Sequence, residues 1–306
     1  FPKNILELFN PIKYFKVFLQ IKKLVKKNPT AIYYLHTPLA SHLFRFFTIF
    51  KKVKIIYFVH GFRFNSLTNP IKRFFFKFIE RIFSLKTNLF ITINNEDFNY
   101  AKNNLAKASS CYKVNGVGLN LPTKHFKKKL KDKKRVEKIL VISAYKKEKG
   151  YPEILKIAEI LKSRSFKINC YGYGSYDKYN SIKIKKNLNN ITFNKFDINL
   201  KDKIKKFDVL LHLSKREGLP VSVMQSLSEG LPVICYNIRG NNDLIKDKFN
   251  GHFVKSYKEV PNILFYLNLE KNYFNKMRFN ALRSINKNFL KEKINLNIYR
   301  IIKKVF

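Results

Sequence analysis

Short apolar runs alternate with longer amphipathic stretches over the first part of the chain. The short runs, rich in Ile, Phe, Tyr and Leu, lie at residues 31–36, 54–61, 88–94 and 112–116. Segments with a helical spacing of apolar residues lie at residues 11–27, 70–86 and 96–107. Runs of the first kind favour buried strands, and strands that alternate with helices are typical of a parallel sheet. The pattern therefore predicts an α/β domain over residues 1–123.

The same alternation restarts after a basic stretch at residues 124–137, KHFKKKLKDKKRVE, which has the composition of a solvated linker. Further strands are predicted at residues 138–144, 166–172, 190–193, 208–214, 231–236 and 251–254. From Glu270 onward the pattern is helical. Two such series predict two parallel-sheet domains, a number that suits the length of 306 residues. We expect the second domain at 138–288 and a last helix, 289–306, that packs back on the first.

The formal net charge of +42 narrows the choice of partners. A charge of this size favours an anionic partner, which is either nucleic acid or an anionic membrane surface. The chain is also rich in Lys, Asn, Ile, Phe and Tyr together, so a compositional bias of the source genome accounts for part of the excess. The basic residues are spread over the whole chain and form no nucleic-acid-binding motif. We therefore expect an anionic membrane surface as a partner and no nucleic acid.

The sequence contains no run of about 18 uncharged apolar residues, so we expect no membrane-spanning helix. We also expect no signal peptide. The three cysteines, Cys111, Cys170 and Cys235, lie in apolar or strand-like settings, without the spacing of a disulfide framework or a metal site. These features predict a reducing, cytoplasmic location.

The stretch 217–233, EGLPVSVMQSLSEGLPV, contains the same five residues twice. In the first copy, Pro220 suits the first position of a helix, where no backbone N–H is needed. In the second, Gly230 suits the left-handed position after the helix, and Pro232 prevents its continuation. We therefore attribute the likeness to turn chemistry and not to a repeat. Glu217 then lies on a loop beyond the carboxyl end of a strand, where open α/β sheets bind ligands, and the helix N-terminus favours phosphate.

Eight segments in order resemble those of family-4 retaining glycosyltransferases. They are IYYLHTPLA (32–40), VHGFRFN (59–65), ITINNEDFNYAK (91–102), VNGVGLNLPTKHF (114–126), YKKEKG (145–150), GYG (172–174), SKREGLPVSVMQSLSEGLPVI (214–234) and RGNNDLI (239–245). The ordered set covers nearly the whole chain, although no single segment is specific. The resemblance implies the GT-B fold, in which two Rossmann-like domains face each other across a cleft. It is nearest to enzymes of bacterial capsule, exopolysaccharide or O-antigen assembly.

What the resemblance implies is transfer of a sugar from a nucleotide-sugar to a lipid-linked or growing polysaccharide acceptor. The anomeric configuration would be retained, and neither a metal nor another cofactor would be needed. Such an enzyme would act in bacterial surface-glycan biosynthesis, peripherally on the inner face of the plasma membrane.

The resemblance also assigns roles to individual residues. Glu217 matches the first glutamate of the family's Glu-x7-Glu motif, which hydrogen-bonds the hydroxyls of the donor sugar. Lys149 matches the basic residue that pairs with the diphosphate, and a cation there neutralises the leaving group. His60 matches a histidine of the first domain that faces the donor sugar, while His36 is a weaker candidate. The other donor-binding residues are the close-approach glycines Gly172 and Gly174, the amide donors Gly218, Leu219 and Val221, and Gln225.

Departures from the family pattern keep a second interpretation open. Gln225 replaces the second glutamate, which binds the nucleotide ribose, and the lost charge weakens that binding by ~1 kcal/mol. Glu229 lies one helical turn, about 5–6 Å, beyond that position and is expected to be a poor substitute. Ala144 and Lys195 replace residues that are more common in the family. The family's first strand and glycine loop have no counterpart, which predicts an exposed edge of the first sheet. The alternative is a truncated, non-catalytic relative that acts as a partner in a glycan-assembly complex.

Residues 70–86 form an amphipathic pattern that suits two interpretations. Its apolar face is expected to comprise Ile71, Phe75, Phe78, Ile79 and Ile82, with Phe74 and Phe76 pointing elsewhere. Cations surround it at Lys72, Arg73, Lys77, Arg81 and Lys86. Such a helix suits docking on anionic lipid, and it also suits packing in the core of a Rossmann domain. Both can hold, since Phe74 and Phe76 point elsewhere.

Overall fold

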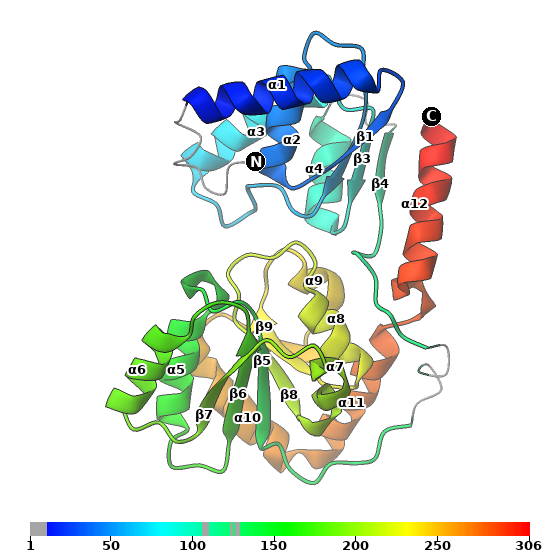
Figure 1. The fold of residues 1–306 in the computed structure, drawn as a ribbon. Helices are drawn as coiled ribbons and strands as arrows, with labels where there is room; N and C mark the ends of the chain where they lie inside the picture. Colours follow the sequence, from blue (N-terminus) through cyan, green and yellow to red (C-terminus); the bar gives the residue numbers. More distant parts are fainter. Residues whose placement is uncertain (1–10, 106–109, 123–124, 126–128) are drawn as a thin grey trace. The chain divides into compact units, whose positions relative to one another are not determined.

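The structure is a computed structural model, and it describes residues 11–105, 110–122, 125 and 129–306. It divides into two compact units, each with its own sheet (Figure 1). Unit 1 comprises the chain up to Gly116 together with Asn295–Phe306, and unit 2 comprises Val117–Ile294. Two parallel α/β sheets were predicted from the sequence, and this fold class is confirmed.

The basic stretch 124–137, expected to be a linker, belongs to unit 2, although residues 124 and 126–128 lie outside the described part. Its backbone is fixed by amide side chains of the helical tail. Asn275 Oδ1 accepts from the backbone N–H of Lys133, and Asn268 Oδ1 accepts from that of Val136. The described end of this stretch is therefore held by specific hydrogen bonds and is not merely solvated.

Unit 1 contains four parallel strands in the order β1-β2-β3-β4. The strands are β1 (Ile32–His36), β2 (Lys54–Val59), β3 (Leu89–Thr92) and β4 (Cys111–Lys113). Every residue of β3 is buried, as expected for a parallel strand that is covered on both faces. Among the described residues, β1 pairs with β2 alone, so its other edge has no partner strand there.

Along the chain, the helices of unit 1 precede, connect or follow these strands. They are α1 (Pro11–Lys27), α2 (Pro38–Phe47), α3 (Pro70–Ser84), α4 (Asn95–Asn104) and the part of α12 (Lys291–Val305) from Asn295 onward. Because the connections from β1 to β4 all run in one direction along the sheet, right-handed crossovers place α2, α3 and α4 on the same face.

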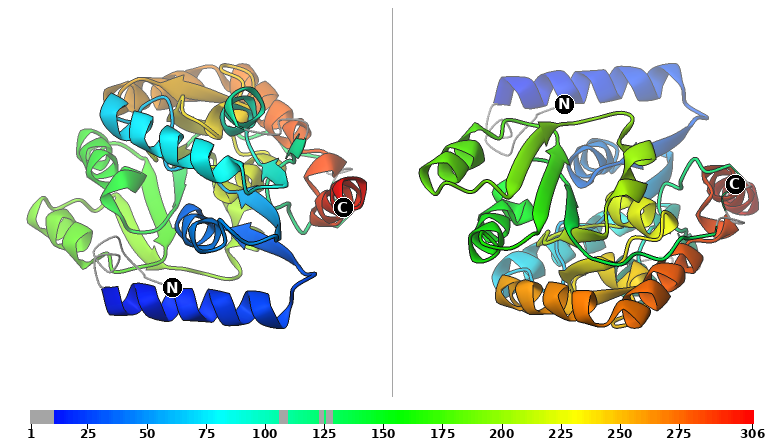
Figure 2. Two further views of the ribbon diagram at one scale, coloured as in Figure 1. Left: turned by 90° about the horizontal axis from the view of Figure 1, so that it is seen from above. Right: turned by 90° about the horizontal axis from the view of Figure 1, so that it is seen from below.

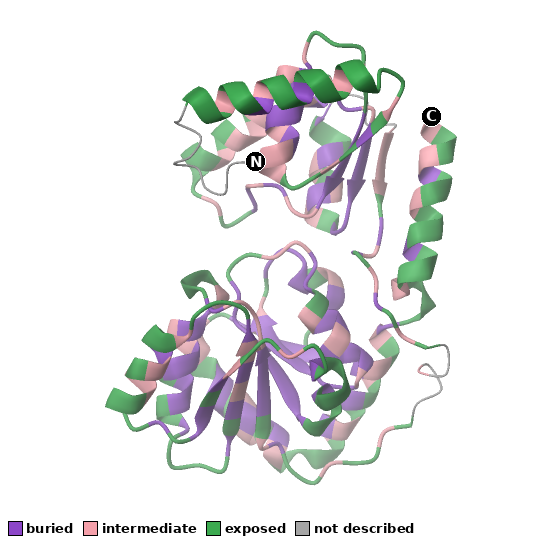
Figure 3. Cartoon of the chain, viewed as in Figure 1, coloured by how far each residue is buried: buried purple, intermediate pink, exposed green. Residues whose placement is uncertain are grey.

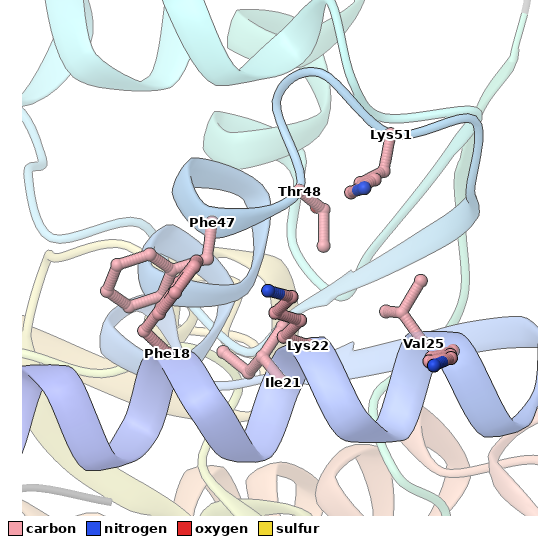
Figure 4. A pocket seen from close by; sticks show the side chains of 8 residues that line it. Phe18, Ile21, Lys22, Val25, Phe47, Thr48 and Lys51 are labelled. Carbon is pink, nitrogen blue, oxygen red and sulfur yellow. The ribbon is translucent and has the colours of Figure 1, made fainter.

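Helix α1 packs on α2 through one buried stripe. Val17 and Ile21 join Leu43 and Phe44 of α2 in a common apolar cluster. Next to this contact lies a cavity of about 390 Å³ (Figure 4). Its lining consists of Phe18, Ile21, Lys22, Val25, Lys26, Phe47, Thr48 and Lys51. The rest of α1 is largely exposed (Figure 3).

Unit 2 contains six parallel strands in the order β10-β9-β8-β5-β6-β7. The strands are β5 (Lys138–Ile142), β6 (Lys167–Gly172), β7 (Ile191–Lys195), β8 (Val209–His212), β9 (Val233–Tyr236) and β10 (Gly251–Val254). The chain runs outward from β5 to β7, returns to the middle at β8, and then runs outward on the other side. The neighbours β5 and β8 therefore form the switch point at which such sheets bind ligands.

The helices of unit 2 cover both faces of this sheet. They are η4 (Lys147–Lys149), α5 (Tyr151–Ile160), α6 (Asp177–Lys185), α7 (Leu200–Lys203), η5 (Ile204–Lys206), α8 (Val221–Ser228), α9 (Asn241–Leu244), η6 (Tyr257–Glu259), α10 (Val260–Leu269), α11 (Lys271–Ser284) and η7 (Lys287–Phe289). The reversal of direction at β8 puts α5 and α6 on one face and α8 on the other (Figure 2). Helix α11 packs on α8. The central strands, which lie between the helices of the two faces, are buried.

A glycine in the turn after β5 packs closely against the end of β8. Gly150 has a φ of 86°, and a Cβ at this position would lie 2.4 Å from the carbonyl oxygen of Leu213. Both the left-handed backbone and the close approach therefore require glycine. Gly174, with a φ of 94°, has no atom within 4 Å of the corresponding position.

We therefore expect Gly150→Ala to destabilise unit 2 more than Gly174→Ala does. Both substitutions strain a left-handed residue, at about 1–2 kcal/mol, but only the first also forces a side chain onto a backbone carbonyl. The midpoints of urea unfolding measure the two losses. Equal losses would show that the packing at Leu213 does not require glycine.

Candidate functional site

Glu217 lies in the loop between β8 and α8, beyond the carboxyl end of a central strand. Its side chain is only 15% exposed. A carboxylate withdrawn from water to this extent needs partners that compensate its lost hydration. The structure supplies them from two neighbouring strands.

Lys149, at the end of η4, is the first partner. Its Nζ donates a hydrogen bond to Oε1 of Glu217 at 2.5 Å. The residues reach each other because η4 follows β5, which is the neighbour of β8 in the sheet. Two residues that lie far apart in the sequence, and that the resemblance assigns to donor binding, are thus brought together.

His212, the last residue of β8, is the second partner, and the sequence analysis gave it no role. Its Nε2 lies 3.4 Å from the same oxygen of Glu217, in a close contact without the geometry of a full hydrogen bond. The imidazole is almost completely buried. A sequence signal was present, since a polar residue ends an otherwise apolar strand shortly before Glu217.

The environment of Glu217 sets its protonation state. Burial raises the pKa of its carboxyl group, but the neighbouring His212 and Lys149 lower that pKa by more, from 4.5 to about 2. Glu217 is therefore ionised at neutral pH, where both carboxylate oxygens accept hydrogen bonds and neither donates one.

The loop after β9 holds the backbone around Glu217 through a hydrogen bond and a close packing contact. Arg239 is buried, and its Nε donates to the backbone oxygen of Glu217 at 2.9 Å. The next residue, Gly240, has a φ of 81°, and a Cβ there would lie 2.3 Å from the backbone oxygen of Gly218. The segment RGNNDLI, which contributed to the resemblance, thus has a physical role in holding this loop.

Helix α8 begins and ends as the doubled stretch predicts, with one shift. Pro220 is the N-cap residue and Val221 the first helical residue, so the helix begins one position later than expected. Gly230 has a φ of 74°, which confirms the left-handed exit. The residues Gly218, Leu219 and Val221 lie at the N-terminal end of α8, where backbone amides and the helix dipole favour anions.

A cavity of about 220 Å³ lies beside α8 within unit 2. It is lined by Gly118, Leu119, Asn120, Leu121, Lys201, Ile204, Val221, Gln225, Ser228 and Glu229. Gln225 contributes an amide, while Lys201 and Glu229 contribute opposite charges. Glu229, which lies one turn further along α8, therefore lines the same cavity as Gln225.

The two glycines expected to admit the nucleotide have different surroundings. A Cβ at Gly172 would lie 1.8 Å from the backbone oxygen of Ser143, so the packing of β6 on the end of β5 already requires this glycine. Gly174 faces open space. Between them, the ring of Tyr173 stacks on that of Phe196 with centroids 4.0 Å apart, and both side chains are exposed. The two residues of this aromatic pair directly follow β6 and β7, and the pair was not predicted from the sequence.

His60 lies in unit 1, directly after β2, and His36 ends the neighbouring strand β1. Nε2 of His60 and Nδ1 of His36 are 2.9 Å apart, so one ring donates and the other accepts. Burial lowers the pKa of both imidazoles, and His36 lowers that of His60 further. Thr37, next in the chain, has a φ of 65°, which is strained for a β-branched residue. The catalytic role of His60 stays a prediction, and His36 is its hydrogen-bond partner.

Two searches of the described residues gave negative results. They contain no group of three or more His, Cys, Asp or Glu side chains placed to hold a metal ion. They also contain no helix with the length and apolar character needed to cross a membrane.

Comparisons with known proteins match both halves of the chain. The family model described as glycosyl transferases group 1 matches residues 122–273, and the model described as glycosyl transferase 4-like matches residues 4–94. The Bacillus subtilis (strain 168) protein EpsD, whose name places it with the glycosyltransferases, is 27% identical over 258 residues, which are 78% of this chain and 67% of EpsD. The Escherichia coli UDP-Gal:alpha-D-GlcNAc-diphosphoundecaprenol alpha-1,3-galactosyltransferase is 28% identical over 264 residues, which are 80% of this chain and 67% of that enzyme.

Solved structures show the same fold at low sequence identity. Sucrose-phosphate synthase from Thermosynechococcus elongatus has a TM-score of 0.77 and 13% identity, over 95% of this chain and 77% of its own. HepE from Anabaena, in complex with UDP, has a TM-score of 0.74 and 13% identity, over 93% and 82%. The match to TarM (TM-score 0.71, 19% identity) covers 93% of this chain and 57% of TarM, so the chain spans little more than half of that protein. Both halves of the chain thus match families of glycosyltransferases, and the chain has the GT-B fold.

Proposed function

We propose that this protein transfers a sugar from a nucleotide-sugar donor to a lipid-linked or growing polysaccharide acceptor, with retention of the anomeric configuration. One observation carries the proposal. Lys149, Glu217 and the N-terminal end of α8 lie together at the switch point of the unit 2 sheet. A cation, a carboxylate and free amides are the groups that a sugar diphosphate needs.

Donor binding would exchange the partners of the ion pair. The diphosphate takes the charge of Lys149 and the amides of Gly218, Leu219 and Val221. The hydroxyl groups of the sugar donate to the carboxylate of Glu217, whose pKa of about 2 keeps it an acceptor. Without a donor, the cation and the anion satisfy each other at 2.5 Å.

In the proposed reaction, the bond between the anomeric carbon and the diphosphate oxygen breaks, and the acceptor oxygen bonds to that carbon on the same face. The electron pair of the broken bond stays with the nucleoside diphosphate, which also takes up the acceptor's hydroxyl proton. Lys149 and the α8 amides stabilise the negative charge that develops on this leaving group. We propose that these groups suffice without a metal ion or another cofactor, and that His60 also acts in the transfer.

The nucleoside would lie beside the diphosphate in unit 2. The amide of Gln225 faces the 220 Å³ cavity and can both donate to and accept from the ribose hydroxyls. The exposed rings of Tyr173 and Phe196, at the carboxyl ends of β6 and β7, offer a stacking surface for the base. Adjacent strands are roughly 5 Å apart, so these rings lie within reach of a nucleotide anchored at β5.

The net charge of the chain and the names of its relatives together support a proposal for the acceptor and the location. The Escherichia coli relative is named for a diphosphoundecaprenol-linked acceptor, and a Klebsiella pneumoniae relative, 26% identical over 250 residues, is named for its cps region. We infer that this protein acts on a lipid-linked acceptor in bacterial surface-glycan biosynthesis, peripherally on the inner face of the plasma membrane. The net charge of +42 favours such a location, because that surface is anionic.

We expect Lys149→Ala and Glu217→Ala each to weaken the binding of nucleotide-sugars at least roughly tenfold, because each removes a charged partner of the donor. Calorimetry with UDP-glucose, UDP-galactose and UDP-N-acetylglucosamine measures the change. Lys186→Ala, which removes an exposed ion pair with Glu159, is the control. If both site variants bind the whole panel as the parent does, the assigned site is wrong. Donor binding without hydrolysis or transfer would favour the non-catalytic alternative.

Gln225→Ala and Glu217→Ala should differ in which ligands they bind more weakly. Gln225 is proposed to contact the ribose, so its loss should weaken the binding of UDP and of UDP-sugars alike, by roughly fivefold. Glu217 is proposed to contact the sugar, so its loss should weaken UDP-sugars far more than UDP. The same calorimetric titrations separate the two. An identical ligand profile for both variants would contradict the assignment.

The low pKa of Glu217 makes the free energy of unfolding depend on pH in the acidic range. The folded-state value of about 2 lies below the ordinary 4.5, so the unfolded chain takes up the proton first as the pH falls. This stabilisation is complete above about pH 5, is on the order of 3 kcal/mol, and is lost as the pH falls toward 2. Glu217→Gln should therefore flatten the loss of stability over this range, as measured by urea unfolding at several pH values. The control is Glu159→Gln, in an exposed ion pair, and an unchanged slope in Glu217→Gln would contradict the ionised, buried carboxylate.

A further inference from the structure

Helix α3 packs on the core through Phe76 but leaves another apolar face exposed. Its fully buried residues are Glu80 and Ser84, whereas its phenylalanines Phe74, Phe75 and Phe78 are 55–74% exposed. The α3 apolar stripe consists of six exposed residues: Ile71, Phe74, Phe75, Phe78, Ile82 and, directly after the helix, Leu85. Their spacing of three and four residues puts them on one side, opposite Glu80.

A buried charge cluster fixes this orientation. The two carboxylate oxygens of Glu80 accept from Nε2 of His42 and from Nη2 of Arg45, each at 2.8 Å. The guanidinium of Arg45 also lies over the rings of Tyr57 and Phe83, at 4.5 and 5.3 Å. Burial raises the pKa of Glu80, but Arg45 and His42 lower it by more, so the carboxylate stays charged. Turning α3 to bury its phenylalanines would break this cluster.

The stripe differs in part from the expected one. Ile71, Phe75, Phe78 and Ile82 share the exposed face, as predicted from the sequence. Phe74 belongs to the same face and was wrongly assigned elsewhere, while Ile79 is half-buried. The other interpretation, a helix packed on the core, holds as well, because Phe76 packs against the buried cluster of unit 1 while the stripe is exposed.

Cations flank the stripe on both sides. Lys72 and Arg81 are exposed. Arg73 donates to the backbone oxygen of Ser66, and Lys77 lies 5.0 Å from the ring centroid of Tyr100. The acidic residue within α3 is Glu80, whose charge is buried. The exposed surface of the helix is therefore an apolar strip between basic margins.

We propose that α3 docks unit 1 on an anionic lipid bilayer, with the stripe in the interfacial region and the cations at the headgroups. The exposed apolar area is on the order of several hundred Å², at the upper end of what soluble monomers leave uncovered. Aromatic and branched residues between lysines and arginines match the profile of a helix that lies in the membrane plane. A protein partner would instead have to present acidic residues on both margins of an apolar groove. The choice of a bilayer rests on the proposed function, which places the acceptor in a lipid.

The first test is binding to vesicles of phosphatidylcholine with about a third phosphatidylglycerol, in the absence of any nucleotide-sugar. The triple variant Phe74→Ser, Phe75→Ser, Phe78→Ser should bind at least roughly tenfold more weakly. The double variant Lys72→Gln, Arg81→Gln should lose a similar factor and much of the preference for phosphatidylglycerol. Phe279→Ser, at an exposed phenylalanine of α11, is the control and should bind as the parent does. Unchanged circular dichroism and thermal midpoints establish that the variants fold.

A second test uses the absence of tryptophan from the chain. Phe78→Trp then provides a single reporter on the stripe, and Phe279→Trp provides one on α11. On addition of the vesicles, the first should shift to shorter wavelength and be quenched by brominated lipid chains. The second should change in neither respect. Equal responses from the two reporters would overturn the proposal, because the basic charge of the whole chain would then suffice for binding.

The outcomes distinguish this proposal from the proposed function. Glu217→Ala should bind vesicles as the parent does, and the triple serine variant should bind nucleotide-sugars as the parent does. If the serine variant keeps full vesicle affinity, the docking surface is wrong while the donor site is untouched. If light scattering shows a dimer that the serine substitutions dissociate, and vesicles do not bind, then a second copy covers the stripe and the bilayer is excluded.

Discussion

The proposed donor site depends on the charge of Glu217 being stable at a place where little water reaches it. Lys149 and His212 make that possible, and both reach the carboxylate only because β5 and β8 are neighbours at the point where the sheet changes direction. Arg239 and Gly240 then fix the backbone of the same loop from β9. A single carboxylate thus draws together the carboxyl ends of three strands. The arrangement has a chemical consequence. A cation and an anion that pair with each other can instead pair with the diphosphate and the hydroxyl groups of a ligand.

The same physics acts with a different result in unit 1. Glu80 is buried and charged, and Arg45 and His42 compensate it as Lys149 and His212 compensate Glu217. In unit 2 the charged group lies in a loop and is 15% exposed. In unit 1 it faces the interior, so its effect is to orient a helix. The phenylalanines of α3 lie on more than one side of the helix, and the position of the buried charge cluster decides which of them are exposed. The exposed stripe therefore follows from a buried ion cluster, and not from a lack of apolar residues to bury.

The sequence was sufficient for features that depend on local pattern. Each of the ten strands among the described residues overlaps a predicted run, although β4 begins one residue before its run and β7 ends two residues after its run. Parallel strands covered on both faces are recognisable in this way because they are largely apolar. The exit of α8 at Gly230 followed from turn chemistry. The supports of the site did not follow, since His212 and Arg239 become meaningful only when their strands lie beside β5. Neither did the fixing of residues 129–137, which depends on Asn268 and Asn275 some 130 to 140 residues later in the chain. Periodicity also misplaced Phe74, because it indicates a helix face but not which face a buried charge will claim.

The cavity beside α8 gives a physical reason for the most prominent departure from the family pattern. Glu229 lines this cavity together with Gln225, so an acid remains in it even though the motif's second glutamate is absent. A glutamate at 225 would place two carboxylates in about 220 Å³, and each would raise the pKa of the other. An amide avoids that repulsion and still donates to and accepts from vicinal hydroxyls. Lys201, which also lines the cavity, can balance one negative charge more readily than two. Gln225 thus supplies a neutral hydrogen-bonding group where the family's motif has its second glutamate, and Glu229 is an acidic residue that lines the same cavity.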